Sequence, residues 1–130
     1  MKIFMLLADA AQEVNGKLFI LGGGWDVGSS PMPTMSVAIK AEIPWTSTNK
    51  KLNWSLKLVN EDGNTITDEA GNVIGTAGQF EVGRPPGHHE GTPISFPMAL
   101  NINNLVLASG RYEWQLEIDD SKESVAFLIR

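Results

Sequence analysis

The sequence predicts an all-β protein, an antiparallel β-sandwich of the immunoglobulin-like kind with eight to nine strands. Apolar side chains recur at every second position in several segments, most clearly at Leu52, Trp54, Leu56 and Leu58. That period is typical of a strand with one buried face. Turn signals follow one another at short spacing, and no amphipathic helix of even two turns stands out. A closed β-barrel is the alternative architecture.

Length and composition are those of one globular domain, which we place at residues 1–130. Hydrophobic residues make up 42% of the chain and charged residues 19%, which argues against disorder. The absence of cysteine excludes disulfides and thiolate metal sites, and weakly favours a reducing compartment. The formal net charge of −5, without any cluster of Lys or Arg, argues against nucleic-acid binding and against anionic membrane surfaces.

The N-terminal segment is predicted to be the first strand, Lys2–Ala8. Its apolar patch is shorter than the core of a secretory signal peptide. No apolar run in the chain approaches the length of a membrane span. We therefore expect neither export nor membrane insertion.

The segment Lys17–Val27 is predicted to hold the central strand of the sheet. Four consecutive apolar residues, Leu18–Leu21, are typical of a strand buried on both faces. The Asn15-Gly16 pair is a strong hairpin signal, so we expect this strand to pair with Lys2–Ala8. The following Gly22–Gly24 run predicts a bulge or sharp bend, because it lacks the spacing of a phosphate-binding loop.

The remaining strands follow from alternation, from prolines and from turn residues. The last two form the clearest hairpin, because alternate apolar positions are kept on both sides of the Asp120–Glu123 turn. The expected segments are Val37–Ile43, Leu52–Leu58, Thr65–Thr67, Val73–Val82, Phe96–Ile102, Tyr112–Ile118 and Val125–Ile129.

No pattern in the sequence indicates a catalytic or metal site. His88 and His89 are the only histidines, and neighbouring residues of an extended chain point to opposite faces, so they are poorly placed to chelate one ion. Asp119 and Asp120 lack the alternating acidic pattern of a calcium loop. No nucleophile elbow occurs, and no fixed partner for either histidine can be identified. We expect no enzymatic activity and no cofactor.

A surface for a partner or ligand is expected where aromatic and cationic residues occur outside the alternating segments. Trp45 follows Pro44 at a strand end, whereas Trp54 and Trp114 lie in alternating segments and are expected in the core. The Gly83–Pro93 loop is the one long irregular segment. The candidate residues are Trp25, Trp45, Arg84, His88 and His89.

Several stretches resemble a family of small, uncharacterised, stand-alone bacterial proteins, mostly actinobacterial, known only as a domain of unknown function. The matching stretches are LLADAA, GKLFILGGGW, IPWT, FEVGRPPG and SGRYEWQLEID. The resemblance implies a cytoplasmic or phage-associated bacterial protein and brings no activity, cofactor or partner. The segment Asp68–Gly75 departs from the family pattern. The last hairpin is also similar to the closing strands of immunoglobulin-like domains, where a tyrosine in the position of Tyr112 bonds back to the backbone.

Two apolar faces on the first strands lead to the functional expectation. One face can meet the core, and the other must be covered by the glycine bend, a loop or a second copy. We therefore expect a non-catalytic interaction or assembly module that self-associates. The alternatives are a phage-derived virion or decoration protein and a module that binds small molecules or carbohydrates. The second face is either Phe4/Leu6 with Phe19/Leu21 or Ile3/Met5/Leu7 with Leu18/Ile20.

Overall fold

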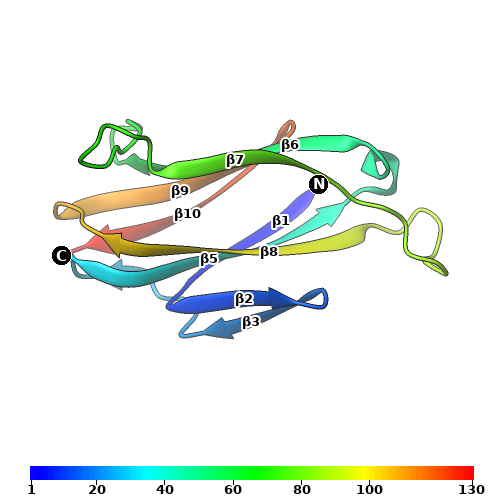
Figure 1. Ribbon diagram of the computed structural model, residues 1–130, viewed down its shortest axis with the longest axis horizontal. Helices are drawn as coiled ribbons and strands as arrows, with labels where there is room; N and C mark the ends of the chain where they lie inside the picture. Colours follow the sequence, from blue (N-terminus) through cyan, green and yellow to red (C-terminus); the bar gives the residue numbers. More distant parts are fainter.

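The computed structural model describes residues 1–130 and is an antiparallel β-sandwich with a small hairpin outside its two sheets (Figure 1). Ten strands are present, where the sequence predicted eight to nine. The strands are β1 (Lys2–Ala8), β2 (Ala10–Val14), β3 (Lys17–Leu21), β4 (Val27–Gly28), β5 (Met32–Ile43), β6 (Lys51–Asn60), β7 (Gly75–Glu81), β8 (Ile94–Leu105), β9 (Gly110–Ile118) and β10 (Ser121–Ile129), and a 3-10 turn, η1, spans Trp45–Ser47.

The first sheet has the order β1-β5-β8, and all its pairs are antiparallel. β5 lies in its centre and is buried on both faces. Val37 and Ile39 point into the sandwich and are fully buried, while Ser36 and Ala38 on the other face are buried as well. The prediction that Lys17–Val27 holds the central strand is therefore wrong.

The second sheet has the order β4-β10-β9-β6-β7, with β4 alone parallel to its neighbour. The predicted C-terminal hairpin is confirmed, with Trp114 opposite Val125 and Ile118 opposite Ser121. Alternate residues of β9 point inward, so Trp114 and Leu116 are buried. Trp54 of β6 is only half-buried, because its strand neighbour opposite is Gly78, which leaves one side of the indole uncovered.

One hydrophobic core fills the space between the two sheets. It includes Leu7 from β1, Ile39 from β5, Leu58 from β6 and Phe127 from β10. Tyr112 closes one end of this core, and its hydroxyl donates a hydrogen bond to the carbonyl oxygen of Ala108 at 2.8 Å. That is the backbone bond expected for this tyrosine from the sequence. The structure has no helix that could cross a bilayer.

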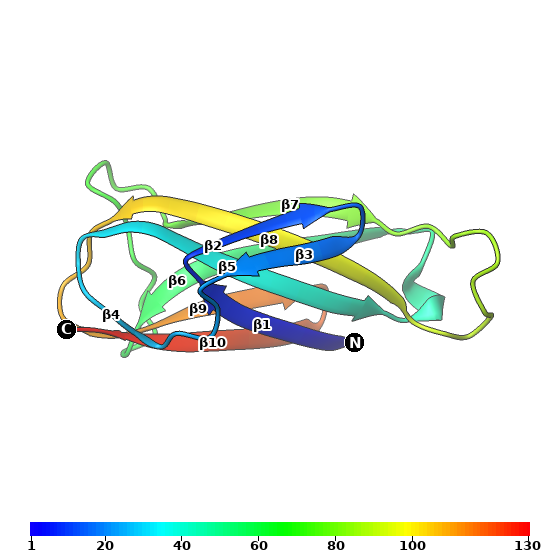
Figure 2. The same cartoon turned by 90° about the horizontal axis from the view of Figure 1, so that it is seen from below.

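β2 and β3 form a separate two-stranded hairpin joined by Asn15-Gly16 (Figure 2). β3 was expected to pair with β1, and this prediction is wrong. A two-residue turn joins residues that face each other directly, so Asn15-Gly16 pairs Val14 with Lys17 and makes β2 the partner of β3. β1 pairs with β5 instead, with Met5 opposite Ile39.

The Gly22–Gly24 run forms the expected sharp bend after β3. Gly22 and Gly24 have φ angles of 62° and 89°, which favour glycine. The amide of Gly24 donates to the carbonyl oxygen of Leu7 at 2.7 Å, so the bend returns the chain to β1. Trp25 then packs edge-on against Phe127.

The predicted strand Thr65–Thr67 is reduced to isolated bridges, from Thr65 to Val59 and from Thr67 to Val73. Tight turns lie on both sides of it. The side-chain oxygen of Asn60 accepts from the amide of Asn64, and that of Asp68 accepts from the amide of Asn72. These turns leave too few residues between them for a continuous ladder.

Candidate functional site

Trp45, Arg84 and His88 meet at one end of the sandwich, although the first and the last lie 43 positions apart in sequence. The guanidinium carbon of Arg84 lies 3.9 Å from the centroid of the Trp45 ring, which is a cation–π contact. The His88 ring is nearly parallel to the indole, with 6.1 Å between centroids and 11° between planes. The Gly83–Pro93 loop is thus attached to η1 through its side chains.

Hydrogen bonds fix the position of Arg84 on the indole. Its Nε donates to Oγ1 of Thr48 at 2.7 Å, and one Nη donates to the carbonyl oxygen of Trp45 at 3.1 Å. Thr48 is buried and donates to that same carbonyl oxygen. Because Arg84 covers one part of the indole, a ligand that stacks on Trp45 would have to share or displace this contact.

Two of the five candidate residues lie outside this cluster. Trp25 follows β3 and packs on Phe127 of β10 instead of on η1. Its indole Nε1 is buried and has no hydrogen-bond partner. His89 is exposed, and its Nδ1 lies 3.2 Å from the carbonyl oxygen of Glu90. The structure therefore brings Trp45, Arg84 and His88 together and leaves Trp25 and His89 apart.

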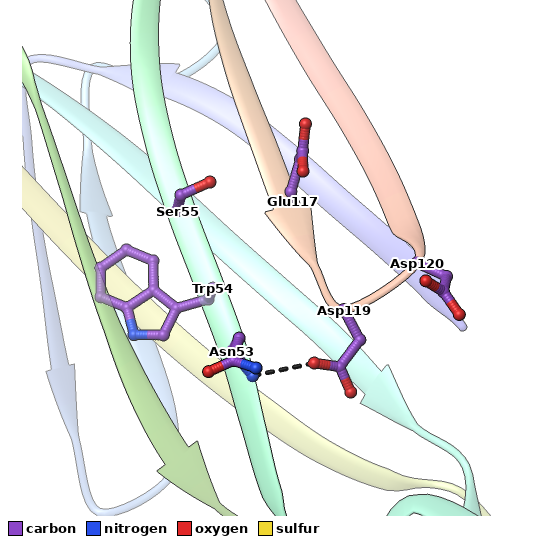
Figure 3. Close-up of a pocket in the computed structure, with 6 residues that line it drawn as sticks. All are labelled: Asn53, Trp54, Ser55, Glu117, Asp119 and Asp120. Atoms are coloured by element: carbon purple, nitrogen blue, oxygen red, sulfur yellow. Dashed lines mark hydrogen bonds between the residues drawn. The ribbon is translucent and has the colours of Figure 1, made fainter.

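The turn between β9 and β10 forms a shallow polar hollow with β6 (Figure 3). The amide of Asn53 donates to Oδ1 of Asp119 at 2.9 Å, and the amide of Asp119 donates back to the carbonyl oxygen of Asn53 at 2.8 Å. The carboxylates of Glu117, Asp119 and Asp120 diverge instead of converging on one point. No group of three or more His, Asp or Glu side chains is placed to hold a metal ion. These two hydrogen bonds join β6 to the turn between β9 and β10.

The largest concentration of exposed apolar side chains lies on the β2–β3 hairpin and on the outer face of β1. Leu21 is 70% exposed and Phe19 is 57% exposed, although the sequence suggested a buried strand. Phe4 and Leu6 of β1 are also exposed, while Ile3, Met5 and Leu7 face the core. We call this the apolar surface; its members are Phe4, Leu6, Phe19, Ile20 and Leu21.

β1 and β3 approach one another on this surface at the glycine bend. A Cβ atom added to Gly23 would lie 2.8 Å from the side chain of Ile20 and 3.1 Å from that of Leu6, so both flank the same backbone. Beside them, the ammonium groups of Lys2 and Lys40 lie 5.9 and 5.7 Å from the centroid of the Phe4 ring. Leu6 of β1 and Ile20 of β3 are therefore neighbours at this bend, and the two lysines lie beside Phe4.

Asn101 positions the hairpin on the sandwich, and sequence reasoning missed it. Its Nδ2 donates to the carbonyl oxygen of Ala11 at 3.1 Å, and its Oδ1 lies 3.5 Å from the Ala11 amide. The side chain of Asn101, a residue of β8, thus bonds to the edge of β2 that faces away from β3 and toward the sandwich. The hairpin consequently stands on the sheet by its β2 edge, and β3 is the strand farthest from the sandwich (Figure 1). One asparagine within a strand gives no signal of this role.

Comparisons with known proteins identify a family and no characterised relative. No curated protein matches the chain. No solved structure matches it either. The model of one family matches residues 3–129, which is almost the whole chain. The protein therefore belongs to the family of unknown function DUF6941.

Proposed function

We propose that this protein is a non-catalytic interaction module that self-associates through the apolar surface. The observation that supports this is the exposure of Phe19 and Leu21 on a strand with a partner on one side only. Contiguous apolar patches on monomeric proteins are small, and larger ones mark interaction sites. Aromatic residues such as Phe19 are enriched in protein interfaces, whereas acidic residues are depleted.

The charge distribution supports the same proposal. The chain has a net charge of −5, which opposes close approach of two copies at random orientations. β3 contains no acidic residue and a single lysine, Lys17, at its start. Approach through β3 therefore brings no acidic side chain of that strand against the other copy.

Light scattering coupled to gel filtration tests the proposal over a range of protein concentrations. We expect a dimer or larger species that dissociates on dilution. Leu21→Asp should raise the dissociation constant at least about tenfold, because it places a charge in the interface. Val106→Asp is the matched control, because Val106 is 72% exposed and lies outside the apolar surface. A monomer at millimolar concentration, or equal effects of both variants, would contradict the proposal.

The Tyr112 hydroxyl bond supports an immunoglobulin-like kinship of the sandwich. The stretches GKLFILGGGW and FEVGRPPG support a bacterial, actinobacterial-type origin and a cytoplasmic location, with a virion-associated role as the alternative. Gene neighbourhood separates the last two, since a virion protein would lie among phage structural genes.

A second candidate function is binding of a small molecule or carbohydrate beside Trp45. Its support is the convergence of Trp45, Arg84 and His88, which combines an aromatic plane with a cationic donor. A thermal-shift screen with sugars and small carboxylates tests it. We expect a stabilising shift that Arg84→Gln abolishes and that His89→Gln, an exposed residue of the same loop outside the cluster, leaves unchanged. No shift with any compound would exclude this candidate.

A further inference from the structure

The backbone groups at the outer edge of β3 can be identified from the contacts of β2. Opposite residues in an antiparallel pair either bond to each other or both point away from the pair. The backbone N–H and C=O of Ala11 both face the side chain of Asn101, so these two groups point away from β3. Ile20 is opposite Ala11, so the backbone N–H and C=O of Ile20 must point away from β2. By the two-residue period, Leu18 does the same.

The same reasoning places the alternate residues of β3 toward β2. The carbonyl oxygen of Leu21 accepts from the amide of Asp9 at 3.0 Å, which shows that the backbone groups of Leu21 point toward the β2 side of the strand. Phe19 and Lys17 share this orientation. The free edge of β3 therefore offers the N–H and C=O groups of Leu18 and Ile20, and no residue of the chain takes them.

We infer that two copies of this protein associate by antiparallel pairing of β3 with β3 across a two-fold axis at Phe19. This inference rests on the proposed self-association and specifies its geometry. Leu18 of each copy pairs with Ile20 of the other, which forms four backbone hydrogen bonds. The two hairpins then become one four-stranded sheet, β2-β3-β3-β2.

This register is the one that uses the whole strand. β3 is bounded by the Asn15-Gly16 turn and by the bend at Gly22, so only Lys17–Leu21 is available for pairing. Centring the axis on Phe19 aligns all five residues, whereas centring it on Leu18 or Ile20 leaves two hydrogen bonds. The two Phe19 side chains then lie side by side on one face.

Side-chain chemistry favours a second copy as the occupant of this edge. Phe19 faces its own equivalent, and Lys17 faces Leu21, whose apolar surface can pack along the lysine stem. The two Lys17 residues lie four positions apart, about 13 Å, beyond the Debye length at physiological salt. Natural edge strands are protected by prolines, bulges or inward-pointing charges. Apart from Lys17 at its first position, β3 carries no charge, proline or bulge, and its outer backbone groups match those of an identical strand.

The absence of cysteine allows a direct test with single-cysteine variants in mild oxidant, at a concentration where the wild type is associated. Phe19→Cys should form a disulfide-linked dimer, because residues facing each other at a two-fold axis lie about 4.5 Å apart between Cα atoms. Leu21→Cys is the control. Leu21 is more exposed than Phe19, yet the two copies of residue 21 would lie about 13 Å apart.

Amide hydrogen exchange on the wild-type protein gives a second readout that needs no substitution. Raising the protein concentration should slow exchange of the Leu18 and Ile20 amides at least about tenfold, because only these amides gain partners. The Phe19 amide, already bonded to β2, should change little. If the protein associates but Leu21→Cys cross-links as well as Phe19→Cys, or the Leu18 and Ile20 amides stay unprotected, the pairing is wrong while self-association stands. A monomer at all concentrations overturns both.

Discussion

β5 and β3 are both rich in apolar residues, yet they lie in opposite environments. In β5, Val37 and Ile39 have no exposed surface, because β1 and β8 flank the strand and the second sheet covers it. In β3, Leu21 is mostly exposed, because the strand has a single hydrogen-bonded neighbour and the face that carries Phe19 and Leu21 is uncovered. The difference comes from the number of neighbours that each strand has, and not from its own apolar content.

β5 and β3 also differ in the size of the side chains on the faces that point away from the sandwich core. β5 has Ser36 and Ala38 on its outer face, and both are buried where β2 packs across the sheet. β3 has Phe19 and Leu21 on an exposed face. Small residues occur where the chain covers itself, and bulky apolar residues occur where it does not. That distribution is expected of a surface covered by another molecule.

Replacing one isoleucine in β5 and one in β3 by aspartate should give the largest difference in stability between the two strands. Ile39→Asp buries an unpaired carboxylate in the core and should cost more than about 4 kcal/mol of unfolding free energy, enough to unfold a domain of ordinary stability. Ile20→Asp, measured at a protein concentration where the chain is monomeric, places the charge at a position that is 41% exposed and should cost less than about 1 kcal/mol. Urea unfolding followed by tryptophan fluorescence measures both. Similar losses in the two variants would mean that β3 is as covered in solution as β5.

The sequence was sufficient to predict strands whose partners are close in the chain. The alternation predicted that Trp114 of β9 is buried, which is confirmed, whereas Trp54 of β6, expected in the core on the same ground, is only half-buried. It was not sufficient to identify the central strand. An apolar run such as Leu18–Leu21 shows that both faces are apolar, but whether anything covers them depends on pairing between distant segments, as between β1 and β5.

The candidate site was predictable only as a set of residue types. Aromatic and cationic residues outside the alternating segments identified Trp45, Arg84 and His88, which the fold brings together. The same criterion also selected Trp25, which packs on Phe127 instead. Asn101 could not be found in this way, because an asparagine that bonds to a neighbouring strand edge leaves no pattern in its own strand.

Enlarging Ala38, a small residue of β5 beneath the β2–β3 hairpin, should lower the stability of the protein and so test how tightly the hairpin covers β5. Ala38 is 2% exposed on the outer face of β5, so Ala38→Leu has no room and should cost about 1–3 kcal/mol by overpacking. Ala77→Leu, on an exposed position of the edge strand β7, should change stability by less than about 0.5 kcal/mol. Thermal unfolding by circular dichroism measures both variants. An unchanged midpoint for Ala38→Leu would show that the hairpin does not pack tightly on β5.

Removing the side chain that holds the hairpin should have the smallest effect on global stability and a selective effect on β2. Asn101→Ala deletes the acceptor and the donor that face Ala11, which should cost about 1 kcal/mol. The Ala11 amide should then exchange with solvent faster, while amides of β5 stay protected. Asn103→Ala is the control, because Asn103 is exposed on the same strand and makes no side-chain hydrogen bond within the chain. Because Asn101 fixes which edge of the hairpin faces outward, its loss should also weaken association through β3. A variant that keeps full Ala11 protection would show that packing of β2, and not this asparagine, orients the hairpin.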